Sequence, residues 1–180
     1  MSRINLRGMG VALITPFKED ESVDYDALLR LVDYQLQNGT DYLVVLGTTA
    51  ETPTLTEGEK KQIVELVVNK VNGQIPVIIG EGGNNTRAIV DKLSQEGIYQ
   101  HYKAISEASS LPIIAYNVPG RTGVNMTADT TLRIANEFRN IVAVKEASGN
   151  MTQMDDIIKR KPEHFDVISG DDGVTFPLIT

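Results

Sequence analysis

Short apolar segments alternate with helical patterns along most of this chain. Residues that are apolar without interruption predict buried strands at 10–15, 42–47, 76–80, 112–116, 141–146 and 166–169. Between them, apolar residues at helical spacing predict helices at 24–38, 56–72, 85–93, 94–105, 127–138 and 151–160. Thr56 and Glu59 form a possible capping box at the start of the second helix. The alternation indicates an α/β fold whose parallel sheet is covered by helices.

Two architectures fit this order of elements: an open doubly wound sheet and a (β/α)8 barrel. An open sheet that binds a dinucleotide requires Gly-x-Gly-x-x-Gly after an early strand. The nearest candidate, residues 80–85, lacks the third glycine, so this reading is the weaker one. A barrel commonly has about 250 residues, and this chain has 180.

The alternation fails once, where the helix ending at Leu93 runs directly into the one that Ser94 would cap. A segment the size of a loop plus a strand is missing from the pattern there. At the other end, residues 173–180 follow a strand and begin an apolar segment. We therefore predict a single (β/α)8 barrel domain over residues 1–180, incomplete because it lacks a segment at the 93/94 join and everything after the seventh strand.

Composition restricts the kinds of function. The formal net charge is −7, which argues against nucleic acid and anionic membranes as partners. The absence of cysteine excludes disulfides and thiolate chemistry, and His101 and His164 are too few for a multi-histidine metal site. No apolar run reaches membrane-spanning length, and the N-terminus reads as a first strand instead of a secretory signal. These features favour a cytoplasmic protein that handles a small molecule.

Lys145 is the most informative single residue. It lies near the carboxyl end of the apolar segment 141–146. A buried lysine is costly unless it is paired or deprotonated, and burial lowers the pKa of the amine, which makes it nucleophilic toward carbonyls. The carboxyl ends of barrel strands also form the catalytic face. The alternative is a strand-end lysine that extends to solvent.

Other polar residues follow two more strands. Thr48 and Thr49 lie just after the segment 42–47, where hydroxyls and free backbone N–H groups can hold a small carboxylate. Tyr116 ends another strand, and Arg121 follows five residues later. Tyrosine can relay protons and arginine can bind a carboxylate through two hydrogen bonds. Each feature also has an ordinary reading, as a capped turn or a Pro-Gly turn with a surface arginine, but together they suit imine chemistry on a keto acid.

Residues 169–173 (SGDDG) follow the last predicted strand. Asp171 and Asp172 make a weak case for a cation site, because two carboxylates without further ligands are few for calcium or magnesium. We favour the interpretation that a glycine here lets substrate approach the backbone.

Four motifs together resemble the 4-hydroxy-tetrahydrodipicolinate synthase (dihydrodipicolinate synthase) family, pyruvate-dependent class I aldolases with a barrel fold. They are residues 47–51 (GTTAE), 116–123 (YNVPGRTG), 144–149 (VKEASG) and 169–172 (SGDD). The resemblance extends over essentially the whole chain, in order.

The resemblance implies a role for each candidate residue. Lys145 would form a Schiff base with pyruvate, Tyr116 would donate and accept protons, and Thr48 would belong to the proton relay. Thr49 would bind the carboxylate of pyruvate, Arg121 that of aspartate 4-semialdehyde, and Gly170 would line the site. The family acts in lysine and diaminopimelate synthesis, needs no metal or coenzyme, and is usually homotetrameric.

This chain departs from the family pattern at the 93/94 join. The family has a strand there that ends in a Tyr-Tyr motif and supplies a relay tyrosine to a neighbouring subunit. We expect that the chain as written does not close a barrel. Two alternatives stay open: a sister aldolase acting on N-acetylneuraminate or 2-keto-3-deoxy sugar acids, against which Arg121 argues, and a truncated barrel without catalysis that acts as a scaffold.

Overall fold

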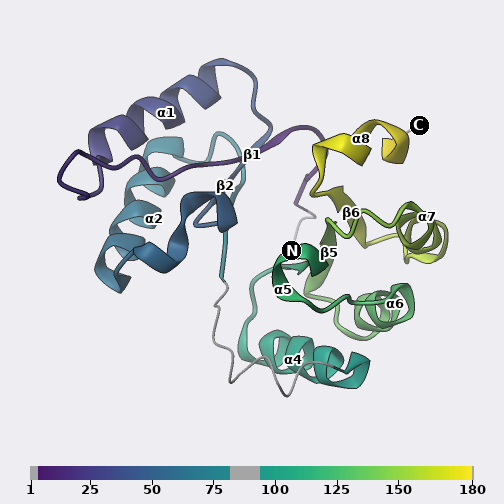
Figure 1. The fold of residues 1–180 in the computed structure, drawn as a ribbon. Coiled ribbons are helices and arrows are strands. Elements are labelled where there is room, and N and C mark those ends of the chain that lie inside the picture. Colours follow the sequence, from purple (N-terminus) through teal and green to yellow (C-terminus); the bar gives the residue numbers. More distant parts are fainter. Residues whose placement is uncertain (1–3, 82–93, 180) are drawn as a thin grey trace. The chain divides into compact units, whose positions relative to one another are not determined.

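The chain divides into two compact units, Met1–Asn84 and Asn85–Thr180. A computed structural model describes residues 4–81 and 94–179. Each unit contains a three-stranded parallel sheet, β1-β2-β3 in the first and β4-β5-β6 in the second. Figure 1 shows the strands and helices of both units. In the described ranges no helix is long and apolar enough to cross a membrane.

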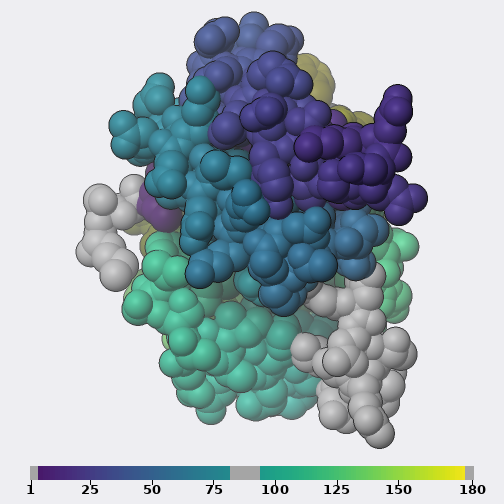
Figure 2. Space-filling view, turned by 90° about the vertical axis from the view of Figure 1, so that its left-hand side faces the viewer, coloured from purple at the N-terminus to yellow at the C-terminus, as the bar shows by residue number. Residues whose placement is uncertain are grey.

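The first unit has two helices packed on its sheet. Its elements are β1 (Gly10–Ala12), α1 (Tyr25–Gln37), β2 (Tyr42–Val45), the short 3-10 turns η1 (Thr48–Ala50) and η2 (Thr52–Thr54), α2 (Glu57–Val71) and β3 (Val77–Ile79). Leu28 of α1 and Val67 of α2 are buried with Leu43 of β2 in one apolar core. Side chains of α1 and α2 form part of this unit's outer surface (Figure 2).

Side-chain caps explain where these helices begin. Asp24 accepts a hydrogen bond from the Ala27 N–H at the start of α1. Thr56 and Glu59 form the predicted capping box at the start of α2, each side chain bonding the other residue's backbone N–H. Capping satisfies backbone donors that have no partner within the helix. The capping-box prediction is therefore confirmed.

In the second unit strands again alternate with helices. Its elements are α4 (Gln95–Ala108), β4 (Ile113–Asn117), α5 (Pro119–Thr122), α6 (Ala128–Glu137), β5 (Ile141–Glu146), α7 (Met151–Arg160), β6 (Asp166–Ser169) and α8 (Asp172–Ile179). Ile98 of α4, Ile134 of α6 and Ile157 of α7 are buried with Ile141 and Val144 of β5.

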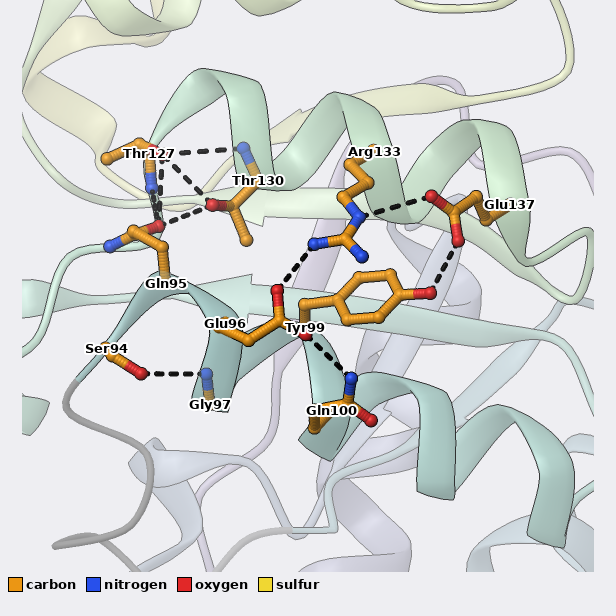
Figure 3. Close-up of polar contacts among 10 residues, drawn as sticks. All are labelled: Ser94, Gln95, Glu96, Gly97, Tyr99, Gln100, Thr127, Thr130, Arg133 and Glu137. Atoms are coloured by element: carbon orange, nitrogen blue, oxygen red, sulfur yellow. Dashed lines mark hydrogen bonds and ion pairs between the residues drawn. The ribbon is translucent and has the colours of Figure 1, made fainter.

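Polar contacts as well as apolar ones join α4 to α6 (Figure 3). The Gln95 Oε1 atom accepts hydrogen bonds from the Thr127 N–H and from the hydroxyls of Thr127 and Thr130. Further along, the Arg133 guanidinium lies 3.5 Å from the centre of the Tyr99 ring and bonds Glu96 and Glu137. The start of α4 is thereby fixed to the start of α6.

Most of the predicted elements are present, with ends that differ by at most three residues. The segments 141–146, 151–160 and 166–169 form the predicted strand, helix and strand. The first three strands are shorter than predicted, and β2 ends just before Leu46, whose φ is 56°. Ser94 caps α4 as expected, accepting from the Gly97 N–H. The predicted helix at 85–93 and the 93/94 join lie outside the described residues.

Two loops differ in detail from the sequence reading. Residues 119–122, read as a Pro-Gly turn, form one helical turn that ends at Gly123, whose φ is +72°. The apolar segment that begins at Gly173, to which the sequence analysis assigned no element, belongs to the helix α8. The aspartate at the start of α8 suits the positive end of the helix dipole.

Candidate active site

The second unit places Lys145 against Tyr116. In the parallel pair β4–β5, Tyr116 is the register partner of Lys145, so both side chains project from the same face of the sheet. The Lys145 Nζ atom lies 4.7 Å from the centre of the Tyr116 ring. Lys145 is partly buried, which lies between the two readings of the sequence, a buried lysine and a strand-end lysine that extends to solvent. A phenol and an amine therefore share one surface at the carboxyl ends of adjacent strands.

The surroundings of Lys145 favour its neutral form. Burial is the main cause that lowers the pKa of the Lys145 amine below its ordinary value, and the positive charge of Arg121 lowers it further. The carboxylate of Asp172 acts in the opposite direction. A lysine with a lowered pKa carries more of the nucleophilic amine near neutral pH.

Gly170 leaves the space that Lys145 occupies. It directly follows β6, and its N–H donates to the Glu146 carbonyl at 2.8 Å. A Cβ atom at this position would lie 3.0 Å from the Lys145 Cε atom and 3.0 Å from the Ala147 Cβ atom. The three strands β4, β5 and β6 thus bring Tyr116, Lys145 and Gly170 to one place.

Arg121 lies on α5, directly after β4, and its side chain is exposed. Its charge acts on Lys145, so the short helical turn brings a cation near the amine. An exposed guanidinium next to a nucleophilic amine can bind an incoming carboxylate.

Thr48 and Thr49 belong to the first unit, on η1 after β2, and both are exposed. The turn that carries them is flanked by Leu46 and Glu51, whose φ angles of 56° and 53° are left-handed. Such values are uncommon for residues other than glycine. These two threonines belong to the first unit, whereas Lys145 belongs to the second.

Two polar residues near Lys145 were missed by the sequence reasoning. Glu146, the next residue on β5, is fully buried and accepts hydrogen bonds from Asn117 and Gln153. The Tyr102 hydroxyl, on α4, accepts the Tyr116 N–H at 3.2 Å, and burial raises the pKa of Tyr102. The signal for Glu146 was present, because a carboxylate in an otherwise apolar strand requires polar partners.

The acidic residues after β6 do not form a cation site in the structure. The Asp171 Oδ1 atom accepts the Gly173 N–H at 3.0 Å, which shapes the start of α8. Within residues 4–81 and 94–179, no group of three or more histidine, aspartate or glutamate side chains is arranged to hold a metal ion.

Comparison with known proteins decides which family has this arrangement. The sequence model described as the dihydrodipicolinate synthetase family matches residues 5–92 and 89–180, and together these matches cover nearly the whole chain. This chain belongs to the dihydrodipicolinate synthetase family.

Individual relatives agree with this assignment. The chain is 69% identical to a 4-hydroxy-tetrahydrodipicolinate synthase of Parabacteroides distasonis, covering 100% of this chain and 68% of that relative. A crystal structure of a dihydrodipicolinate synthase from Bacillus anthracis superimposes with a TM-score of 0.90 at 42% identity, covering 98% of this chain and 67% of that one.

The dihydrodipicolinate synthase of Acinetobacter baumannii, solved in complex with pyruvate, gives a TM-score of 0.89 at 38% identity. The alignment covers 97% of this chain and 67% of that one. The chain thus spans about two thirds of the length of these family members, and its fold is an incomplete form of their (β/α)8 barrel. The predictions of family and fold class are confirmed.

Proposed function

We propose that Lys145 forms a Schiff base with pyruvate and that the protein condenses pyruvate with L-aspartate 4-semialdehyde to give 4-hydroxy-tetrahydrodipicolinate. The observation that carries this proposal is the position of the Lys145 amine, 4.7 Å from the centre of the Tyr116 ring and with a lowered pKa. The family assignment supports it, as does the pyruvate bound by the Acinetobacter baumannii relative.

The proposed first step forms the imine. The neutral Lys145 Nζ atom attacks the keto carbon of pyruvate, and the carbonyl oxygen leaves as water after receiving two protons. Tyr116 is the group next to Lys145 that would deliver and recover protons, as the family resemblance implies. Loss of a proton from the methyl carbon then gives an enamine, whose carbon attacks the aldehyde and forms the new carbon–carbon bond.

Three further residues have proposed binding or relay roles. Thr49 binds the carboxylate of pyruvate, and Thr48 passes protons to and from Tyr116. Arg121 binds the carboxylate of aspartate 4-semialdehyde, which agrees with its exposure and with its charge near Lys145. The presence of Arg121 also argues against the alternative function, that of a sister aldolase acting on sugar acids. This chemistry requires no metal or coenzyme.

We also propose that the chain lacks an internal segment at the 93/94 join. The alignment with the Parabacteroides distasonis relative is 201 positions long, whereas this chain has 180 residues. At least 21 of those positions are therefore gaps in this chain, which is enough for a loop and a strand. The family model also matches in two pieces that meet near this join. We propose a single barrel domain that is incomplete there.

The setting of the reaction is proposed from the family resemblance and the composition. We place the enzyme in the cytoplasm, in lysine and diaminopimelate synthesis, as a homotetramer that binds neither nucleic acid nor membranes. A net charge of −7 supports the last point, because it repels phosphate groups.

Trapping with borohydride tests the proposed function. Pyruvate and borohydride should add the mass of one reduced pyruvate to the intact chain. Lys145→Ala should abolish the addition. Lys61→Ala is the matched control, because Lys61 is a highly exposed lysine of the first unit, and this variant should be labelled like the parent. Equal labelling of all three proteins would contradict the assignment, and no labelling of the parent would favour a scaffold without catalysis.

A further inference from the structure

The β4–β5 pair presents two polar pairs, on opposite faces of the sheet. Tyr116 is the register partner of Lys145, and Asn117 is the partner of Glu146. Successive side chains of a strand alternate between faces, so the proposed reactive pair lies on one face and the pair Asn117–Glu146 lies directly behind it. The second pair is buried, with exposed fractions of 3% and 0%.

The Glu146 carboxylate is held entirely by amide donors. The Asn117 Nδ2 atom lies 3.1 Å from both carboxylate oxygens, the Gln153 Nε2 atom lies 3.1 Å from Oε2, and the Ser148 N–H donates to Oε1 at 2.8 Å. No lysine, arginine or histidine of the described ranges forms an ion pair with it. A buried carboxylate requires such donors, because it has lost its water. Removing one donor is therefore costly.

The same residues fix the carboxyl ends of all three strands. The Asn117 carbonyl accepts the Ala147 N–H at 2.9 Å, and the Glu146 carbonyl accepts the Gly170 N–H at 2.8 Å. The Asn117 Oδ1 atom also accepts the Met126 N–H at 3.0 Å. Contacts of Glu146 and Asn117 thus determine the path of the chain where it leaves β5, just after Lys145.

Three helices are tied to this cluster. Gln153 on α7 exchanges a hydrogen bond with Asn125, whose Nδ2 atom donates to the Gln153 Oε1 atom at 2.9 Å. The Asn125 carbonyl accepts from Gln95 of α4, and the Gln95 Oε1 atom accepts from the start of α6 (Figure 3). The cluster therefore resists movement of β5 relative to the helices behind it.

We propose that Glu146 is a positioning residue: its contacts with Asn117 and Gln153 hold the end of β5 so that the Lys145 amine stays packed beside Tyr116 and Gly170. The inference deepens the proposed function and depends on it for its catalytic meaning. Its test, however, uses a property of Lys145 that exists without any substrate.

The test measures the pKa of Lys145 by competitive acetylation followed by peptide mapping. The groups that act on this amine are Arg121 from α5 and Asp172 from α8, with the Tyr116 ring beside it. Glu146→Gln keeps the shape of the side chain but replaces one accepting carboxylate oxygen with an NH2 group. That group is a donor and faces the amide donors of Asn117 and Gln153. If β5 then loosens and water reaches Lys145, its pKa rises and its acetylation rate at neutral pH falls about three- to tenfold.

The sign of the change separates this role from the alternatives. Removing a negative charge near Lys145 without movement lowers the lysine pKa, because the ammonium loses a favourable partner. A role in general stability leaves the pKa in the folded protein unchanged. A lower or unchanged pKa would therefore overturn the proposal, whereas a higher one supports it.

Matched variants complete the design. Glu137→Gln alters an exposed glutamate of the same unit and should leave the pKa of Lys145 unchanged. Gln153→Glu in the Glu146→Gln background exchanges carboxylate and amide across a 3.1 Å contact. This second substitution should lower the pKa of Lys145 part of the way back to its value in the parent. If Glu146→Gln does not fold, Gln153→Met removes one donor and should act in the same direction. Because no pyruvate is used, failure of this test is distinct from failure of pyruvate trapping.

Discussion

At the residue scale, position in the strand decides how the two charged residues of β5 behave. Lys145 and Glu146 are neighbours in sequence but project from opposite faces, and the glutamate is the more deeply buried. The sequence predicted the lysine, because its isolation in an apolar strand was visible. The glutamate in the same apolar strand was also visible but was overlooked. Its partners could not be predicted, because they are 29 and 7 residues away and only folding brings them together.

Arg121 should affect the aldehyde substrate and the pKa of Lys145 differently. In Arg121→Ala, the lost carboxylate contact should raise the KM for aspartate 4-semialdehyde roughly tenfold or more. Imine formation with pyruvate should persist, but its pH profile should move to higher pH, because the positive charge that lowers the pKa of Lys145 is gone. Added salt should move the parent's profile the same way by screening the exposed charge.

Steady-state kinetics and trapping rates between pH 6 and about 10 check this prediction. A variant that cannot form the imine at any pH would mean that Arg121 serves pyruvate. A profile that moves to lower pH would contradict the electrostatic argument.

Gly170→Ala should disturb Lys145 with little effect on folding. The new Cβ atom would lie 3.0 Å from the Lys145 Cε atom and 3.0 Å from the Ala147 Cβ atom, so the flexible lysine side chain has to move. We expect slower pyruvate trapping and a free energy of unfolding close to that of the parent. Gly120→Ala is the control, since a Cβ atom there meets nothing within 4 Å. Equal trapping rates in both variants would mean that the space at Gly170 is not needed.

At the element scale, the period of the apolar pattern predicted most strands and helices, and capping residues predicted where helices begin. The pattern was less informative at the carboxyl ends of the first strands. There, local backbone geometry decides, as at Leu46, whose φ of 56° ends β2 although the apolar sequence continues. The backbone angle of a single residue cannot be predicted from a pattern of apolar residues.

At Gly80 the backbone of a neighbouring segment of the chain comes very close. A Cβ atom at Gly80 would lie 2.3 Å from the Leu46 carbonyl oxygen, and backbone cannot move aside as a side chain can. Gly80→Ala should therefore lower the free energy of unfolding by about 1–3 kcal/mol.

Gly58→Ala is the contrasting variant. Gly58 lies in the first turn of α2, where a Cβ atom has only the Thr56 Oγ1 atom at 4.0 Å, so alanine should raise stability by roughly 0.5–1 kcal/mol. Urea denaturation of both variants measures the difference. A Gly80→Ala protein as stable as the parent would show that β2 and β3 separate easily.

At the scale of the whole molecule, the residues with proposed roles are divided between the two units. Tyr116, Lys145 and Gly170 lie together in the second unit, while Thr48 and Thr49 lie in the first. The order of strands and helices predicted the barrel fold, and the break in that order is the basis for the proposed gap at the 93/94 join. The contacts that close a barrel could not be predicted from the pattern, because strand order along the chain does not fix them.

Restoring the segment that we propose is missing at the 93/94 join should increase condensation activity. Inserting the corresponding residues of the Parabacteroides distasonis relative between positions 93 and 94 would return a loop and a strand to the barrel. We expect the condensation rate to rise by more than tenfold, because the second substrate would then meet a closed site. The measurement is the rate of pyruvate consumption in the presence of aspartate 4-semialdehyde. An insertion of equal length made of glycine and serine is the control, and equal rates for both would contradict the missing-strand account.

The most direct test of the central claim is to locate the trapped adduct along the chain. The protein has nine lysines, and peptide mapping after treatment with pyruvate and borohydride reports the occupancy of each. The account predicts one reduced pyruvate, on Lys145, because its amine is placed beside a tyrosine at the carboxyl end of a strand and has a lowered pKa. An adduct spread over the exposed lysines, or concentrated on any lysine other than Lys145, would contradict it.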